Sequence, residues 1–105
     1  MSVAPILDTL HSAISLKQIV QDVDLSGLDL RRVDLTGLIA QRLLAFRTRF
    51  DYALLTEAQL IEADFTEANL DGSHLASSNL GLAAFNQASM REVCLQYALF
   101  SNGYC

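Results

Sequence analysis

The chain has 105 residues, 51% of them hydrophobic, and a formal net charge of −5 at pH 7. This length suits one domain with one core, and the apolar share argues against a disordered chain. The acidic balance disfavours nonspecific binding of nucleic acid, which needs a basic surface. We expect neither a membrane span nor a secretory signal, because charged or polar residues interrupt every apolar run.

Residues 1–22 are expected to form a capping segment that contains a short helix. Pro5 suits the first turn of a helix. Four apolar residues then share one helical face, and three more lead on toward the next segment: Ile6, Leu7, Leu10 and Ile14, then Leu16, Ile19 and Val20. We therefore predict a helix over residues 5–14 that covers the N-terminal end of the following domain. The alternative is a helix that docks onto a partner.

The segment over residues 23–105 repeats every five residues. Of the sixteen positions divisible by five between 25 and 100, fourteen hold Leu, Phe or Met. We call all sixteen the centre positions, and these fourteen form the predicted core: Leu25, Leu30, Leu35, Phe50, Leu55, Leu60, Phe65, Leu70, Leu75, Leu80, Phe85, Met90, Leu95 and Phe100. A small residue usually stands two places before the centre, Asp or Asn often stands directly before it, and two mostly polar residues follow.

A period of five fits neither a helix nor a simple strand. Residues two apart in an extended chain point the same way, so the small residue and the centre both face inward. The residue between them faces outward, and a bend must follow before the next inward pair. Each unit is therefore a short extended edge plus a turn. Repeated bending in one sense winds the chain into a coil whose turns stack at about 4.8 Å.

The repeated order is a small residue, Asp or Asn, Leu or Phe, and two variable residues. It keeps one phase from residue 23 to residue 102 and resembles the pentapeptide-repeat family. The resemblance implies an all-β fold, a right-handed quadrilateral β-helix with four units per turn and about four coils. Residues twenty apart would then stack, so Phe65 would lie beneath Phe85.

Residues 38–47 depart from the pattern. Their centres are Ala40 and Ala45, whereas Leu38 and Leu43 take the positions of the small residues. This exchange keeps the inner volume and favours a continuous coil. The alternative is a short helix that bulges from the rod, because apolar residues of this segment also suit helical spacing.

The C-terminal end of the coil has no counterpart to the N-terminal helix. Residues 103–105 look like the start of a further unit with Cys105 at its centre. Stacked coils expose apolar side chains and unpaired backbone at their ends. The last coil would be covered by another chain, through the end-to-end dimerisation that the resemblance implies, or would continue in a longer protein. The sequence leaves both readings open.

No catalytic or metal-binding constellation is recognisable. His11 falls in the capping helix, His74 takes an outward position, and Cys94 and Cys105 lack the spacing of metal ligands. A filled rod offers no cleft to exclude water from a nucleophile and its base. We therefore expect no enzyme activity, no metal and no cofactor. Two free thiols favour the reducing cytoplasm, with secretion independent of a signal peptide as the alternative.

Apolar residues at outward positions are the candidate site. Four of them map to one face of the predicted coil: Ile39, Ile61, Leu82 and Leu99. Three others lie outward around the second coil: Leu44, Phe46 and Leu54. Scattered apolar residues are normal on a protein surface, but several on one face more often mark contact with another chain. We predict that this face binds a protein partner or a second copy of the chain.

The favoured function is a noncatalytic rod that serves protein–protein contact, alone or within a larger bacterial protein associated with secretion or effectors. We expect neither nucleic acid nor a membrane as partner. The alternative, implied by the resemblance to quinolone-resistance members of the family, is a DNA mimic that modulates DNA gyrase or another topoisomerase. Mixed charges disfavour this alternative, because Arg31, Arg32 and Arg42 interrupt the acidic residues that a mimic needs in a continuous stripe.

Overall fold

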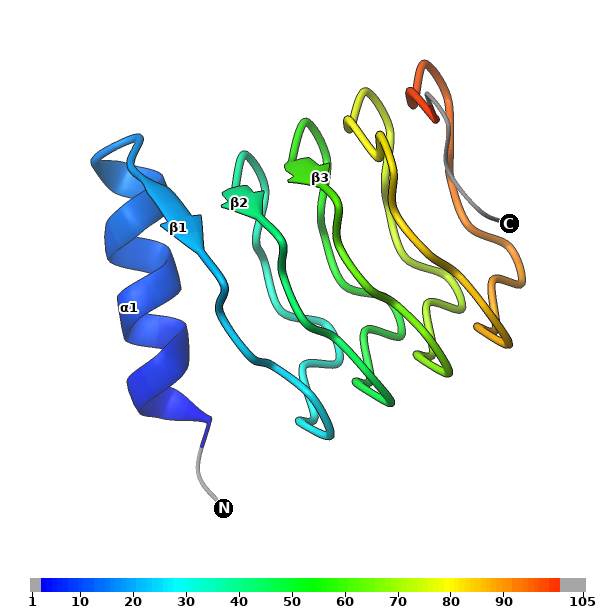
Figure 1. Cartoon of the computed structure of the whole chain (residues 1–105), viewed down its shortest axis with the longest axis horizontal. Helices are drawn as coiled ribbons and strands as arrows, with labels where there is room; N and C mark the ends of the chain where they lie inside the picture. Colours follow the sequence, from blue (N-terminus) through cyan, green and yellow to red (C-terminus); the bar gives the residue numbers. More distant parts are fainter. Residues whose placement is uncertain (1–2, 101–105) are drawn as a thin grey trace.

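The computed structural model describes residues 3–100. In that part of the chain, the helix α1 (Ala4–Ser15) precedes three short strands, β1 (Ile19–Gln21), β2 (Ile39–Gln41) and β3 (Gln59–Ile61). The strands pair in parallel in the order β1-β2-β3. Figure 1 shows successive coils stacked side by side, with α1 across one end. Among the described residues, no helix has the length and hydropathy that a membrane crossing requires.

Backbone pairing joins residues that are twenty apart. Ala40 of β2 lies between Val20 and Leu60, and isolated parallel bridges continue the same register along the chain. One coil therefore contains four five-residue units, and the stacking of residues twenty apart is confirmed. Pairing begins at Ile19, before the predicted start of the repeat domain at residue 23. The division into two domains stays a prediction.

The corners of the coil lie at the second residue after each centre position. Within residues 3–100, every residue with positive φ stands at this place in the five-residue phase, and fourteen of them are not glycine, with φ between 55° and 63°. Left-handed backbone costs an L-residue about 1 kcal/mol. Most corners are closed by a backbone bond, as where the N–H of Ala68 donates to the carbonyl of Phe65 at 2.9 Å. The stacking of coils, more than local preference, therefore holds the corners.

The Asp or Asn before the centre shapes these corners. The Oδ1 of Asp34 accepts the N–H of Thr36 at 3.0 Å, and the Oδ1 of Asn69 accepts the N–H of Asp71 at 2.9 Å. The same bond recurs at four further positions: Asp24, Asp29, Asp64 and Asn79. Such bonds from a side chain to the backbone two residues on favour a turn. They explain a preference that the sequence shows only as a pattern.

The inner side chains fill the coil. Every centre residue from Leu25 to Phe85 is buried, and none is more than 4% exposed. The rings of Phe65 and Phe85 stack with centroids 5.2 Å apart and planes 9° apart, which confirms the predicted contact. Phe50 meets Phe65 edge to face, with a centroid distance of 5.9 Å. The core is therefore a continuous column of apolar side chains.

The last centres depart from the predicted buried core. Met90 and Phe100 are only half-buried, and Leu95 is 36% exposed. Within residues 3–100 no later coil lies over them, so they keep the inward position without full burial. Residues 103–105, the predicted start of a further unit, lie outside the described residues.

Residues 38–47 form a regular coil. They contain β2, and Leu44 bridges to Asp24 and Asp64 on the neighbouring coils. Leu38 and Leu43 point inward and are at most 1% exposed, beside the buried small centres of this segment. The exchange of large and small residues is therefore accommodated inside the coil, and the predicted continuous coil is confirmed over the helical bulge.

Helix α1 covers the first coil. Leu10 and Ala13 are buried, and other apolar residues of the helix pack against the core. Although they belong to the first coil, Leu25, Leu30 and Leu35 are fully buried. The helix extends one residue beyond the predicted range of 5–14 at each end. Its apolar face acts as the end cap that the spacing predicts.

One buried hydroxyl in the core is unsatisfied. Ser73 and Ser78 occupy equivalent small inward positions and are both buried. The hydroxyl of Ser78 donates to the carbonyl of Leu75 at 2.7 Å, whereas the Oγ of Ser73 has no partner among the described residues. We expect Ser73→Ala to raise the free energy of unfolding by about 1 kcal/mol, because an unpaired buried hydroxyl is removed. Urea denaturation measures this, and an equal gain in the control Ser78→Ala would contradict the explanation.

Candidate protein-interaction surface

The residues with catalytic or ligand chemistry are not brought together. His11 lies in α1, where its Nε2 is 2.9 Å from the carbonyl oxygen of Asp34. His74 and Cys94 occupy the same row on neighbouring coils. Within residues 3–100 no three His, Cys, Asp or Glu side chains are grouped as a metal site would require. Cys105 lies outside the described residues.

The pairing register places each predicted surface residue. Ile39 and Leu99 stand in one outward row, separated by Gln59 and Asn79. Ile39 is half-buried, whereas Leu99 is 60% exposed. Ile19, which the sequence placed only in the lead to the first coil, begins the same row and is also exposed. The row is therefore apolar at its two ends and polar between them.

The corner that follows this row carries the other two residues of the predicted face. Ile61 is the first residue of its corner and is half-buried. Leu82 is the second residue of the equivalent corner on the next coil, with φ of 59°, and is 46% exposed. We use the term Leu82 surface for the outward apolar residues of the β-strand edge, of this corner and of the edge after it: Ile19, Ile39, Leu44, Ile61, Leu82 and Leu99.

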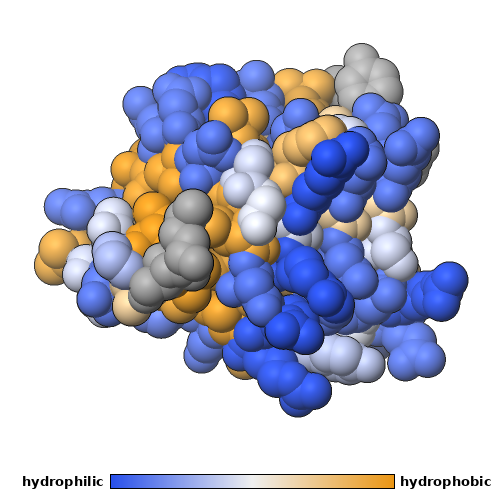
Figure 2. All heavy atoms as spheres, turned by 90° about the horizontal axis from the view of Figure 1, so that it is seen from below, coloured by the Kyte–Doolittle hydropathy of each residue, from blue (hydrophilic) through white to orange (hydrophobic). Residues whose placement is uncertain are grey.

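The three other outward apolar residues, Leu44, Phe46 and Leu54, do not form one surface. Leu44 is exposed on the edge after the Leu82 corner. Phe46 is exposed at the next corner, where the guanidinium of Arg47 lies 5.0 Å from its ring centroid. Leu54 is half-buried in the row of His74, away from the other two. Only Leu44 therefore adjoins the Leu82 surface. Figure 2 views the molecule from below, on the side away from the β strands of Figure 1, and shows an apolar area toward the α1 end beside hydrophilic residues.

Basic residues gather on the edge opposite the β strands. That edge and its two corners hold five of the seven basic residues of the chain: Arg31, Arg32, Arg47, Arg49 and Arg91. They also hold five of the twelve acidic residues: Asp29, Asp51, Glu67, Asp71 and Glu92. The rest of the chain carries seven acidic residues against two basic ones. The net negative charge therefore lies on the other three edges and α1.

The arginines of the basic edge are partly neutralised where they stand. Arg31 bonds to both carboxylate oxygens of Asp29, at 2.8 and 2.7 Å, and this pair lowers the pKa of Asp29 to about 2. Arg49 pairs with the buried carboxylate of Asp51. The guanidinium of Arg32 lies 5.3 Å from the ring centroid of Tyr52. A shallow hollow of about 550 Å³ lies among these residues. Its charges are mostly paired, so it offers no strong anion site.

Acidic residues flank the Leu82 surface. Asp22, Arg42, Glu62 and Leu82 stand one above another in the same corner column. Asp22 pairs with Arg42, whose Nε lies 2.8 Å from its Oδ1, and this hydrogen bond lowers the pKa of Asp22. On the adjoining edge, hydrogen bonds from Ser26 lower the pKa of Asp24. These two carboxylates are therefore ionised at neutral pH.

The sequence and fold were compared with known proteins. A family model described as Pentapeptide repeats (8 copies) matches residues 46–81 and 68–102, which together are more than half of the chain. The curated proteins contain no match. HetL, a pentapeptide repeat protein involved in heterocyst differentiation regulation in the cyanobacterium Nostoc, superposes with a TM-score of 0.64 at 22% identity. This superposition covers 83% of the present chain and 44% of HetL, so the chain spans less than half of HetL.

Two further solved structures are similar at lower scores. A pentapeptide repeat protein from the thylakoid lumen of Arabidopsis thaliana has a TM-score of 0.44 at 26% identity, covering 74% of the present chain and 60% of its own. Rfr23 from the cyanobacterium Cyanothece has a TM-score of 0.38 at 16% identity, covering 91% and 96%. The likeness to HetL shows that the two chains share a β-helix fold.

Proposed function

Because this chain belongs to the pentapeptide-repeat family, we propose that it is a noncatalytic rod that binds another protein through the Leu82 surface. The rod itself would be a right-handed quadrilateral β-helix of about four coils. It would act in the bacterial cytoplasm, alone or within a larger protein associated with secretion or effectors. The bound protein would be a partner or a second copy, and the C-terminal end of the coil would be a second place for such contact.

The observation that carries this proposal is Leu82 itself. Within residues 3–100, the other thirteen non-glycine residues with positive φ are charged, polar or Tyr. Leu82 is aliphatic, adopts the same strained backbone with φ of 59°, and exposes 46% of its surface. It adds little to the core, and a polar residue or Gly would cost less at this corner. Because the strained backbone is common to the corners, it is the exposed aliphatic side chain at a position otherwise polar or Tyr that favours a role in binding.

Solution mass and partner affinity test the proposal. We expect the double change of Ile61→Asp and Leu82→Asp to release the bound protein, because two charges would replace apolar contact. Light scattering would show a lower mass if the surface joins two copies, and titration would show lost affinity if it binds another protein. Tyr52→Asp is the control, because Tyr52 is exposed at an equivalent corner on the opposite side. If the double variant keeps both its mass and its affinity for the partner, the proposal is wrong.

The alternative function is a DNA mimic, and the excess of acidic residues outside the basic edge is the observation that favours it. Its acidic columns are interrupted, since Arg42 and Leu82 stand in one and Leu44 in the next. This interruption supports the scaffold over a mimic, which requires continuous negative charge. A gyrase supercoiling assay separates the two functions. A scaffold should leave supercoiling unchanged, whereas a mimic must alter it.

A further inference from the structure

We propose that the Leu82 surface binds a basic amphipathic segment of its partner, in which Lys or Arg side chains accompany apolar ones. This inference rests on the proposed function and adds the chemistry of the partner. It depends on carboxylates beside the Leu82 surface that form no ion pair within the described residues.

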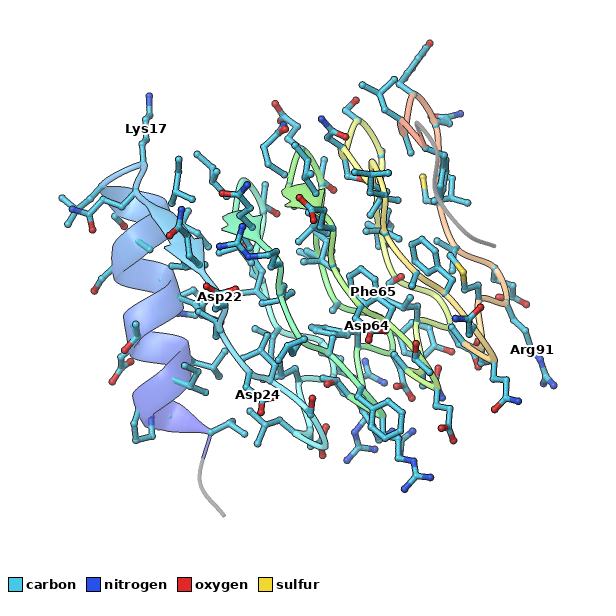
Figure 3. All side chains as sticks on the ribbon, viewed as in Figure 1. Lys17, Asp22, Asp24, Asp64, Phe65 and Arg91 are labelled. Carbon is cyan, nitrogen blue, oxygen red and sulfur yellow. The ribbon has the colours of Figure 1, made fainter. Side chains whose placement is uncertain are left out.

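The only basic side chain in the Leu82 corner column, within residues 3–100, is already engaged. Arg42 directs its Nε to the Oδ1 of Asp22 at 2.8 Å and its Nη2 to the Oδ2 of Asp22 at 3.2 Å. Lys17 lies at the end of α1, and Figure 3 shows its side chain pointing away from the coils. Arg42 also attracts Glu62 electrostatically, but its hydrogen bonds go to Asp22, so neither basic residue forms an ion pair with Glu62.

Three carboxylates that border the Leu82 surface have no ion pair within the described residues. Glu62 directly precedes Leu82 in the corner column, and its N–H donates to the carbonyl of Gly81, but within residues 3–100 its carboxylate has no hydrogen-bond partner. Asp24 and Asp64 accept hydrogen bonds from Ser26 and Thr66, which lie in their own turns and carry no charge. Figure 3 shows Asp24 and Asp64 on the same edge, and the coil that carries Leu44 lies between their two coils. Their negative charge is available to a partner.

Apolar and acidic residues alternate across the surface. Leu44 lies between Asp24 and Asp64 in one row, and Ile61 and Leu82 adjoin Glu62 at the corner. A partner that covers these apolar side chains must also approach the carboxylates. An acidic partner would meet like charge, whereas Lys or Arg on the partner would find complementary charge at the rim of an apolar contact. Helices with one apolar and one basic face meet both requirements.

A second copy of the chain fits this surface less well. The basic residues of a second copy gather on the edge opposite the β strands, where three of the five arginines, Arg31, Arg47 and Arg49, are paired with acidic residues of their own chain. Binding them to the Leu82 surface of another copy would break these pairs. A separate basic segment carries no such cost, so charge complementarity favours it.

A synthetic peptide probes the inference directly. The peptide carries Leu on one helical face and Lys on the other. A comparison peptide has Glu in place of every Lys. Fluorescence anisotropy with the whole protein is expected to show binding of the Lys peptide, weaker binding as salt rises, and none of the Glu peptide. Glu62→Lys should weaken binding about tenfold by reversing the charge beside Leu82.

Glu57→Lys is the matched control. Glu57 and Glu62 are both exposed at the second corner position, with φ of 61° and 62°, but Glu57 lies at the preceding corner. Circular dichroism of both variants shows whether each folds, and Glu62→Gln repeats the test with a smaller change. We expect Glu57→Lys to bind like the unmodified protein. Equal loss in the two lysine variants, or equal affinity for the two peptides, would overturn the inference.

The results also separate this inference from the function on which it rests. If the double change of Ile61 and Leu82 to Asp abolishes protein binding while Glu62→Lys does not alter it, the surface is an interface of different chemistry and the inference fails. If the protein is a dimer and Glu62→Lys leaves its mass unchanged, the inference fails as well. If neither change affects any binding, both the inference and the proposed function fail.

Discussion

Replacing Leu70 by Asp is expected to unfold the protein. Leu70 is fully buried between Phe50 and Met90 in the column of centre residues. A carboxylate there would lose its hydration without gaining a basic partner, which costs several kcal/mol, comparable to the total stability of a small domain. Far-UV circular dichroism and thermal denaturation should show loss of the cooperative transition at neutral pH.

Asn69→Asp provides the control for this prediction. Asn69 is the outward neighbour of Leu70, and its Oδ1 accepts the N–H of Asp71. Aspartate can accept the same bond, so the variant should fold with a melting temperature near that of the unmodified protein. A folded Leu70→Asp variant with an unchanged transition would mean that Leu70 points outward and that the inward register is incorrect.

Truncating Phe65 to Ala is expected to lower the free energy of unfolding by about 3–5 kcal/mol. Phe65 is fully buried and touches two other rings, stacked on Phe85 and edge to face with Phe50. The change removes both aromatic contacts and leaves a cavity in a core one side chain wide. Urea denaturation measures the loss.

Phe46→Ala is the matched control for Phe65→Ala. Phe46 directly follows Ala45, which precedes Phe65 in the inner column, but Phe46 is exposed at a corner, so its truncation should cost about 1 kcal/mol or less. If the two variants lose similar amounts of unfolding free energy, the inner column is not the main source of stability.

The inner half of the fold could be predicted from the sequence because the fivefold phase is unbroken. That phase places Phe65 and Leu70 inward, and it carries the coil through residues 38–47, where large and small residues exchange places. The twenty-residue stacking followed from the family resemblance, since spacing alone does not give the number of edges per turn. The partial exposure of Leu95 was not predicted, because it depends on which coils lie above it.

The corner geometry could not be predicted from the sequence. Charged and polar residues such as Glu57 adopt left-handed backbone there, which local preference disfavours. The stacked coils impose this conformation. The Asp and Asn pattern was visible in the sequence, but its role in holding the corner required the hydrogen bond itself, as between Asp34 and Thr36.

The candidate surface could be predicted only in outline. Outward apolar residues such as Leu82 and Leu99 stand out in the repeat, so hydropathy identified them. Their relative positions depend on pairing, which puts Leu99 in one row and Leu82 at the corner after it. The unpaired carboxylate of Glu62 beside Leu82 became apparent only when Arg42 was found bonded to Asp22.

The central claim is that inward residues maintain the fold and outward residues bind. Leu80 and Leu82 test it most directly, because they are two residues apart and differ in burial, at 0% and 46% exposure. Melting temperature and affinity for the Leu and Lys peptide should be measured for Leu80→Asp and Leu82→Asp. We expect Leu80→Asp to lose folding and binding together, whereas Leu82→Asp should melt as the unmodified protein does and lose only binding. A folded Leu82→Asp variant that binds the peptide as tightly as the unmodified protein would contradict the central claim.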